Sequence, residues 1–218
     1  MDEMQGRTAR IREVRRRLAE EGPPWTRDRA ADFETVTLPR HECDGLRDLL
    51  TAEHARTVVE IGLAYGGSAL AIGEALTTAG AEHPRHIVVD PFQDSAWADV
   101  GWTLLRSAGL EPITTLLRTP SSIALPRLLT EGLVADAAFV DGSHRFHEVF
   151  VDLYFLRRIV RPGGVIVLDD ATAPPVRTAA RYYVRNLGWT VHTETPRCTA
   201  FRLPDPAFEP SFEEFRAF

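Results

Sequence analysis

Lysine is absent from this sequence, and cysteine is nearly so. Without lysine, arginine and histidine are the only basic side chains, a bias typical of GC-rich bacterial genomes rather than of one function. The two cysteines, Cys43 and Cys198, have no close Cys or His at metal-ligand spacing, so we expect free thiols. With a net charge of −6 and an isoelectric point near 5.7, the chain lacks the basic balance of a nucleic-acid-binding protein.

Long hydrophobic runs are also missing. The apolar runs at 134–140 and 165–168 are far shorter than the roughly 20 residues that a membrane-spanning helix needs. The opening MDEMQGRTAR has no apolar stretch of the kind found in a secretory signal. We therefore expect a cytoplasmic protein without a membrane partner. A length of 218 residues with 44% hydrophobic content is enough for one globular core.

Short apolar runs alternate with helical patterns from Thr57 onward. The runs predicted as strands cover 57–61, 86–90, 113–117, 135–141 and 164–170. The predicted helices cover about 67–78, 97–107, 123–129, 146–158 and 176–186. This alternation predicts a doubly wound α/β fold, with helices on both faces of a mostly parallel sheet. Two later runs, 189–194 and 198–203, are so close in sequence that they are expected to pair as an antiparallel hairpin.

Helical spacing also marks the two ends of the chain. Near the start, Ile11, Val14 and Leu18 recur among five arginines, which predicts a solvated surface helix with a narrow apolar stripe. A lid or a dimer contact is the alternative for this helix, and the breaker at 22–24 should end it. In the tail, phenylalanines recur from Phe208 to Phe218, which predicts a terminal helix packed on the body. An oligomer contact or an active-site cover is the alternative there.

A glycine-rich loop, EIGLAYGGSAL, follows the first predicted strand. Gly62, Gly66 and Gly67 allow a tight turn and a close approach of a ligand at the carboxyl edge of the sheet. Their spacing is not GxGxxG, which disfavours a nicotinamide dinucleotide. Asp90, at the tip of the second strand, can accept hydrogen bonds from both hydroxyls of a ribose. Together these features suggest a nucleoside without phosphates, and S-adenosylmethionine (SAM) fits that description.

Four segments, VVEIGLAYGGSA, IVVDPF, VDGSH and RPGGVIVLDD, together resemble class I SAM-dependent methyltransferases. Within that class the resemblance is to metal-dependent small-molecule O-methyltransferases, which include macrolide-sugar and catechol enzymes. It implies a Rossmann-like, seven-stranded sheet in the order 3-2-1-4-5-7-6 with strand seven antiparallel. We accordingly expect an N-terminal helical segment at 1–56, a methyltransferase domain at 57–203 and an aromatic tail at 204–218.

The resemblance also implies which residues contact the cofactor. Glu60 and Gly62 would lie against the methionine part, Ser68 near its carboxylate, and Asp90 on the ribose hydroxyls. Pro120 replaces the acid that such enzymes usually have beside the adenine, so the following serine is the expected contact there. The full set of cofactor-binding candidates is Glu60, Gly62, Tyr65, Gly66, Ser68, Asp90, Ser121 and Asp141. Tyr65 has two alternatives, lining the acceptor pocket and simple packing.

Three aspartates stand at the tips of the fourth and fifth strands, which are neighbours in the implied sheet order. Asp141 ends the fourth strand, and Asp169 and Asp170 end the fifth. Neighbouring strands lie about 4.8 Å apart, so carboxylates at both tips can converge on one ion. Oxygen ligands suit Mg²⁺, which would hold a substrate hydroxyl and make it more acidic. For any one of these aspartates, helix capping or simple exposure is the alternative.

His144 follows Asp141 by three residues, at the predicted start of the next helix. The positive end of a helix and a nearby dication both disfavour imidazolium, so we expect a neutral ring that can accept a proton near pH 7. The resemblance agrees, because metal-dependent sugar O-methyltransferases have an Asp-Gly-x-His stretch here whose histidine acts as the base. His147, one helical turn further on, is the competing candidate, with a surface or packing role as its alternative.

The sequence thus predicts a SAM-dependent, Mg²⁺-dependent O-methyltransferase with His144 as the general base. The expected acceptor is a hydroxylated small molecule such as a natural-product sugar or a catechol-like ring, as in antibiotic biosynthesis and other secondary metabolism. A homodimer or a higher homo-oligomer is possible. The first alternative is a metal-independent methyltransferase in which His144 acts alone and Asp169 or Asp170 contacts the acceptor. The second is a SAM-binding module without catalysis.

Overall fold

The computed structural model describes residues 2–24, 33–78, 80 and 82–218. Residues 25–32, which belong to the predicted N-terminal segment 1–56, lie outside the described residues. The chain divides into two compact units, Met1–Thr119 and Pro120–Phe218, which are described one at a time. In the described part of the chain, no helix has the length and apolar character that crossing a membrane requires.

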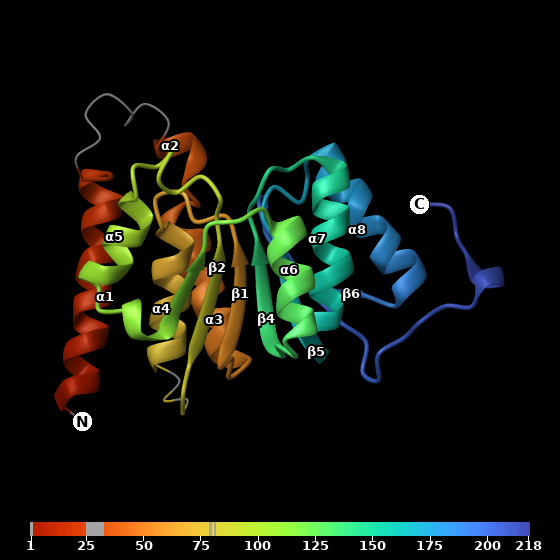
Figure 1. Cartoon of the computed structure of the whole chain (residues 1–218), viewed down its shortest axis with the longest axis horizontal. Helices are drawn as coiled ribbons and strands as arrows, with labels where there is room; N and C mark the ends of the chain where they lie inside the picture. The colour runs from red at the N-terminus through yellow and green to blue at the C-terminus, as the bar shows by residue number, and fades with distance from the viewer. Residues whose placement is uncertain (1, 25–32, 79, 81) are drawn as a thin grey trace. The chain divides into compact units, whose positions relative to one another are not determined.

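The strands form a seven-stranded sheet in the order β3-β2-β1-β4-β5-β7-β6, which confirms the predicted order and fold class (Figure 1). Their bounds are β1 Thr57–Ile61, β2 Arg85–Val89, β3 Thr114–Leu117, β4 Ala135–Val140, β5 Val160–Leu168, β6 Thr190–Glu194 and β7 Thr199–Arg202. In unit 1, β2 pairs in parallel with both β1 and β3. In unit 2, β4 and β5 are parallel, whereas β7 is antiparallel to both β5 and β6, as predicted.

Unit 1 surrounds the buried helix α4 (Gly67–Thr78), whose bounds are those predicted from the sequence. The other helical elements of this unit are α1 Asp2–Glu21, α2 Phe33–Val36, α3 Arg40–Ala52, α5 Val100–Ser107 and the 3-10 turn η2 Glu111–Ile113. Both α1 and α3 pack against α4 (Figure 1). A glycine is needed at Gly73 of α4, because a Cβ there would lie only 2.4 Å from a side-chain methyl of Leu110.

The N-terminal helix α1 carries the apolar stripe that its sequence predicts. Ile11 and Leu18 are buried in the same core cluster as residues of β2 and α5, and Val14 packs against that cluster. Gly22 follows the helix with a φ of +76°, a left-handed conformation that suits glycine, so the predicted helix breaker is confirmed.

Unit 2 holds three helices that pack in sequence order, α6 against α7 and α7 against α8 (Figure 1). Their bounds are α6 Ser121–Thr130, α7 Phe146–Ile159 and α8 Pro174–Leu187. Helix α8 begins with two prolines, which need no donor at a helix start, and ends at Gly188 with a φ of +69°. Tyr183 of α8 is fully buried, and its hydroxyl donates to the Phe150 carbonyl of α7 at 2.6 Å.

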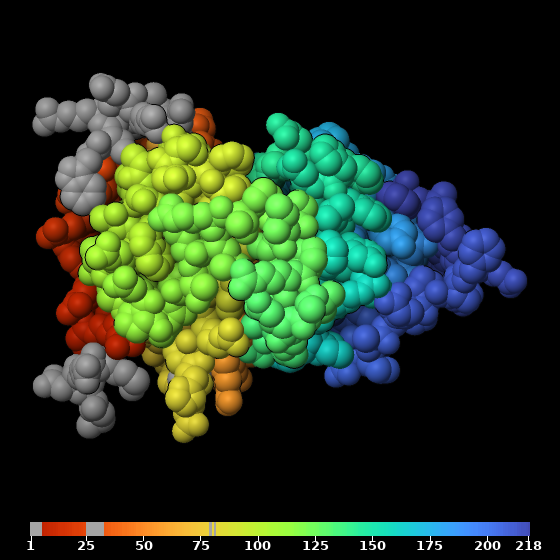
Figure 2. Space-filling model, viewed as in Figure 1, coloured from red at the N-terminus to blue at the C-terminus, as the bar shows by residue number. Residues whose placement is uncertain are grey.

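The predicted terminal helix is wrong. The tail 204–218 has no helical turn other than the short 3-10 turn η3 (Phe212–Glu214), and it forms the dark blue outer edge of unit 2 in Figure 2. Prolines 206 and 210 explain the difference, because each lacks the N–H that an α-helix requires in its interior. The tail is held instead by Asn186 of α8, which accepts from the Arg216 N–H at 2.7 Å and donates to the Arg216 carbonyl at 2.9 Å.

Candidate active site

In unit 1, Asp90 fastens the glycine loop that follows β1. Its Oδ2 accepts hydrogen bonds from the N–H groups of Leu63 and Ala64, both at 3.1 Å, and from Nε2 of Gln93 at 3.0 Å. Its Oδ1 accepts the N–H of Phe92 at 2.8 Å. Asp90 is only 3% exposed, so this carboxylate chiefly organises the loop. Oδ1 accepts a single hydrogen bond, against three for Oδ2, so Oδ1 is the oxygen with room for a further donor.

Four N–H groups of the loop are used within the protein. Besides the two that Asp90 holds, Gly62 donates to the Val89 carbonyl at 2.9 Å, and Gly66 donates to the Leu63 carbonyl at 2.7 Å. A pyrophosphate site needs free backbone donors of this kind. These four donors are therefore not available to a pyrophosphate.

The side chains of Glu60 and Ser68, both expected beside the methionine part of the cofactor, lie against each other. The Ser68 hydroxyl donates to Oε1 of Glu60 at 2.6 Å, and Nε2 of His86 lies 2.9 Å from the other carboxylate oxygen. Both Glu60 and His86 are fully buried. Because its proton is given to Glu60, the Ser68 hydroxyl can only accept a hydrogen bond from a ligand, such as one from an ammonium group.

His86 is a residue of this region that sequence reasoning missed. In the parallel register of β1 and β2, His86 stands opposite Val58, two residues before Glu60. Side chains at alternate strand positions share a face, so His86 and Glu60 fall on the same side of the sheet. The strand period thus contained a usable signal for this pair.

Of the other loop residues, Tyr65 packs in the core. It is 2% exposed and makes edge-to-face contacts with Phe33 and Trp97, with ring centroids 5.5 and 5.3 Å apart. Gly62 and Gly66 have φ values of +92° and +82°, which only glycine adopts readily. The structure thus places Tyr65 beneath the loop and the two glycines in its turns.

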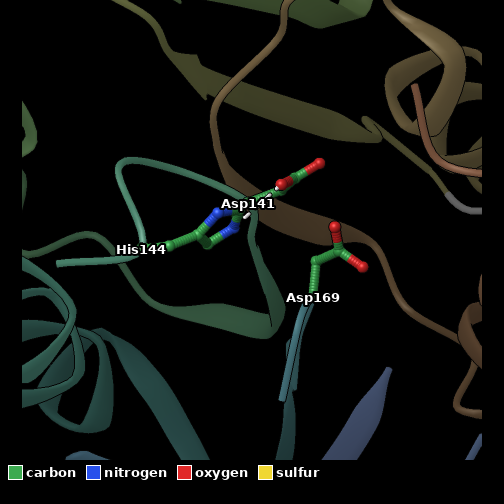
Figure 3. A group of neighbouring side chains, drawn as sticks. All are labelled: Asp141, His144 and Asp169. Carbon is green, nitrogen blue, oxygen red and sulfur yellow. Dashed lines mark ion pairs between the residues drawn. The ribbon is translucent and has the colours of Figure 1, made fainter. Parts of the chain in front are cut away.

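In unit 2, the tips of β4 and β5 bring Asp141, His144 and Asp169 together (Figure 3). Asp141 directly follows β4 and Asp169 directly follows β5; the N–H of Asp169 donates to the Val140 carbonyl at 3.0 Å. One potential ligand atom from each of the three residues lies within 4.8 Å of the others. Figure 3 shows the His144 ring turned toward Asp141, with Asp169 entering from the neighbouring strand.

His144 lies between two carboxylates. Its Nε2 is 3.2 Å from Oδ1 of Asp141, and its Nδ1 is 3.5 Å from Oδ2 of Asp170. The residue has a φ of +55° and stands before α7, which begins at Phe146. Interaction with Asp141 raises the pKa of His144 above its usual value, although burial opposes the rise. The carboxylates thus act against the effect expected of the helix end, and the neutral ring stays a prediction.

Burial and charge also shift the two buried aspartates, in opposite directions. Burial, opposed by the contact with His144, raises the pKa of Asp141 to about 6. Burial would likewise raise the pKa of Asp169, but hydrogen bonds and the charge of Arg197 lower it below its usual value. Asp169 is thus held as a carboxylate at the tip of β5.

Asp170, the third predicted metal ligand, is not part of the group formed by Asp141, His144 and Asp169 in the described part of the chain. Strand β5 ends at Leu168, and Asp170 sits in the following turn with a φ of +48°. Its side chain is 44% exposed and faces His144. Asp169 therefore lies inside the protein and Asp170 nearer the surface, and Arg197 contacts both.

Arg197 is the second residue that sequence reasoning missed. Its Nε donates to both oxygens of Asp169, at 2.8 and 3.0 Å, and its Nη2 donates to Oδ2 at 2.8 Å. The neighbouring Cys198 Sγ donates to Oδ1 of Asp169 at 3.3 Å. Arg197 belongs to the turn between β6 and β7, and the register of β7 with β5 pairs Thr199 with Leu168. The predicted hairpin beside the fifth strand therefore contained a signal for this contact.

Mg²⁺ matches these residues in spacing but not in charge. Each Mg²⁺–oxygen bond is about 2.1 Å long, so a metal on Asp169 would lie within about 5 Å of the Arg197 nitrogens. At that distance a dication and a guanidinium repel by roughly 6 kcal/mol with an effective dielectric of 20. The arrangement as it stands does not fit the metal, because Arg197 already holds both oxygens of Asp169.

The remaining candidates lie nearby in unit 2. Ser121 is the first residue of α6, and its hydroxyl hydrogen-bonds to the buried Asp152 of α7. Burial raises the pKa of Asp152 to about 7. His147 is on the surface, with a side chain 74% exposed and 3.9 Å from Glu148. Among the two histidines considered as a base, His144 is thus the one that contacts the strand tips.

Comparison with known proteins agrees with this architecture. A family model described as a methyltransferase domain matches residues 59–171. No curated protein sequence gave a significant match. Among solved structures, the O-methyltransferase TomG of Streptomyces achromogenes, involved in tomaymycin synthesis and bound to SAM, is 20% identical with a TM-score of 0.68, covering 88% of this chain and 90% of its own.

Two further solved structures are similar to about the same degree. An O-methyltransferase of Bacillus cereus in complex with SAH is 17% identical with a TM-score of 0.64, covering 90% of each chain. A putative O-methyltransferase of Klebsiella pneumoniae is 20% identical with a TM-score of 0.63, covering 91% of this chain and 90% of its own. At such identities the likeness shows the fold, and the family match adds the activity. The chain belongs to the methyltransferase family and is a class I SAM-dependent methyltransferase.

Proposed function

We propose that this protein transfers a methyl group to a hydroxyl of a small molecule, with His144 as the general base. The observation that carries the proposal is the position of His144 at the strand tips, 3.2 Å from Asp141 and 3.5 Å from Asp170. A hydroxyl is poorly ionised at neutral pH, so its methylation requires a group that removes the proton. His144 is the described residue whose contacts best support that task.

The chemistry divides between alignment and proton removal. SAM, when bound, supplies a methyl group activated by its sulfonium sulfur. The acceptor oxygen forms its bond to the methyl carbon as the carbon–sulfur bond breaks, and the hydroxyl proton passes to His144. The contact with Asp170 is the longer of the two, so Nδ1 is the nitrogen assigned to take the proton. Asp141 and Asp170 then stabilise the imidazolium that results.

The cofactor contacts are part of the same proposal. The free acceptor place on Oδ1 of Asp90 supports a bond to a ribose hydroxyl, and the Ser68 hydroxyl supports a bond from the ammonium group. We assign Glu60 to holding Ser68 rather than to direct contact. The other proposed contacts are Gly62, Tyr65, Gly66, Ser121 and Asp141.

The acceptor we propose is a hydroxylated natural product, such as a sugar or a catechol-like ring. The similarity to TomG, which is involved in tomaymycin synthesis, supports a place in secondary metabolism. An acceptor screen should therefore begin with vicinal diols on sugars and aromatic rings. Turnover of any of them would remove the alternative of a SAM-binding module without catalysis.

A Mg²⁺-dependent form of this reaction is the second candidate. It is favoured by the spacing of Asp141, His144 and Asp169, whose ligand atoms lie within 4.8 Å of one another. It is disfavoured by the bonds from Arg197 to Asp169. Turnover measured with a chelator, and again after Mg²⁺ is added back, distinguishes the two forms.

The base is tested by replacing His144 with Ala. We expect His144→Ala to lower turnover by about 10²-fold or more, the usual contribution of a positioned base. Calorimetry should show nearly unchanged SAM affinity, because the proposed cofactor contacts are left in place. His147→Ala is the matched control and should retain full turnover, since this neighbouring histidine is exposed. Unchanged turnover in His144→Ala, or a parallel loss of SAM binding, would show that the residue is misassigned.

A further inference from the structure

A guanidinium group occupies the place where the sequence predicts a divalent metal ion. We propose that Arg197 is the resident cation of this site, and that the enzyme transfers methyl groups without a divalent metal. The inference rests on the proposed function, because it takes the tips of β4 and β5 to be the place of methyl transfer. It assigns Arg197 as a positioning residue that acts through Asp169.

The side chain of Arg197 forms a hydrogen-bonded ion pair with Asp169. Three hydrogen bonds of 2.8 to 3.0 Å join its Nε and Nη2 to both oxygens of Asp169. Its Nε also lies 3.8 Å from Oδ1 of Asp170, so the guanidinium contacts two of the three aspartates predicted as metal ligands. Asp169 is fully buried, and such a carboxylate requires a partner of opposite charge.

The backbone holds Arg197 in this place. The turn that carries it is closed by Thr195, whose N–H donates to the Cys198 carbonyl at 2.8 Å and whose hydroxyl accepts the Cys198 N–H at 2.8 Å. The carbonyl of Arg197 accepts the N–H of Ala171 at 3.0 Å, directly after the two aspartates. Arg197 is thus anchored at both its backbone and its side chain, so its charge is part of the folded site.

Charge balance explains why the arginine and the metal exclude each other. Three carboxylates meet at these strand tips, and one of them, Asp169, is neutralised by Arg197. With the arginine removed, Asp169 would lose its counter-charge within a group of three residues that has the spacing of a metal site. Replacing Arg197 with a neutral side chain should therefore create a metal site that the natural protein lacks.

Manganese binding, followed by electron paramagnetic resonance, tests this directly. For the natural protein we expect Mn²⁺ binding weaker than about 1 mM, the weak end of protein sites for divalent cations. Arg197→Met should bind Mn²⁺ at least about tenfold more tightly. Arg197→Lys, which keeps the charge, should behave like the natural protein. Arg202→Met, in the same hairpin but bonded to the Gly163 carbonyl, is the matched control and should not gain Mn²⁺ binding.

Two results would overturn the proposal. One is Mn²⁺ binding by the natural protein in the micromolar range. The other is a folded Arg197→Met variant that binds Mn²⁺ no better than the natural protein does. If Arg197→Met does not fold, the titration of the natural protein still decides, since it needs no variant. These titrations need no acceptor, so their outcome is separate from the success or failure of the proposed O-methylation.

Activity supplies a second readout once an acceptor is found. The turnover of the natural enzyme should be the same with a chelator and with added Mg²⁺. Arg197→Met should lose turnover, and Arg197→Lys should recover part of it. A natural enzyme that stops with chelator and restarts with Mg²⁺ would also overturn the proposal.

Discussion

Three aspartates of unit 2 have pKa values that are shifted in two different directions. Burial raises the pKa of Asp141 to about 6 and that of Asp152 to about 7. Asp169 is just as deeply placed, yet its pKa is lowered because Arg197 outweighs the effect of burial. Burial therefore sets the direction of the pKa shift at Asp141 and Asp152, whereas the arginine partner sets it at Asp169.

Asp152 gives a pH-dependent prediction. Its carboxyl keeps a proton up to about pH 7 when folded but loses it near pH 4 when unfolded. The folded state thus binds more protons between these values, so the free energy of unfolding should fall as pH rises from about 4 to 7. Asp152→Asn removes this effect. Between pH 5 and pH 8, the free energy of unfolding of Asp152→Asn should rise by about 3 kcal/mol relative to that of the natural protein. Urea unfolding at the two pH values measures this change.

The control for this measurement is Glu213→Gln, at an exposed position of the tail. It should leave the pH dependence of unfolding unchanged. A difference between Asp152→Asn and the natural protein that stays the same at both pH values would mean that Asp152 is ionised throughout.

At the scale of elements, a buried charge joins α1 to α4. Glu74 of α4 is fully buried and accepts from two arginines of α1, from Arg12 at 2.7 Å and from Arg15 in a shorter contact. Arg15 also bonds to Asp44 of α3 at 2.8 Å. The two arginines differ in burial, since their side chains are 64% and 12% exposed, respectively. Glu74 thus forms one ion pair with an exposed arginine, Arg12, and one with a mostly buried arginine, Arg15.

The two arginines should therefore contribute unequally. Arg15→Met is expected to lower the free energy of unfolding by about 3 kcal/mol, because it breaks a buried ion pair. Arg12→Met should cost less than about 1 kcal/mol, as exposed ion pairs do. Denaturant unfolding of the two variants measures the difference. Equal losses would contradict the idea that burial sets the strength of this contact.

The tail has a helical pattern in its sequence but does not form a helix. Its phenylalanines have helical spacing, but Phe212 is 99% exposed and the segment contains no α-helix. The hydrogen bonds between the Asn186 side chain and the Arg216 backbone, together with the prolines of the tail, outweigh the helical spacing of the phenylalanines. By contrast, the bounds of α4 follow directly from the sequence, because its mostly apolar residues lie between two loops and contain no proline.

At the scale of the whole molecule, the methyltransferase fold predicts that the cofactor product stabilises the protein. At a concentration of SAH 100 times its Kd, the folded state should gain about 2.7 kcal/mol. For a protein of this size that gain corresponds to a rise in Tm of roughly 5 to 10 °C, measured by a thermal shift assay. NAD⁺ is the control and should give no rise, since four N–H groups of the loop are already used and its glycine spacing is not GxGxxG. An equal rise in Tm with NAD⁺ would contradict the prediction that the loop binds a ligand without phosphate groups.

The sequence pattern predicted the α/β class, the strands and the polar residues at their tips, whereas the order of the sheet was implied by the resemblance to methyltransferases. Apolar runs of strand length, separated by helical patterns, admit few arrangements, and a short hairpin must be antiparallel. Asp141, His144 and Asp169 were therefore identifiable at adjacent tips. Only the tertiary structure decided which partner each of them has. Arg197 reaches Asp169 from a turn 28 residues away, and that contact depends on side-chain geometry and charge rather than on any local pattern.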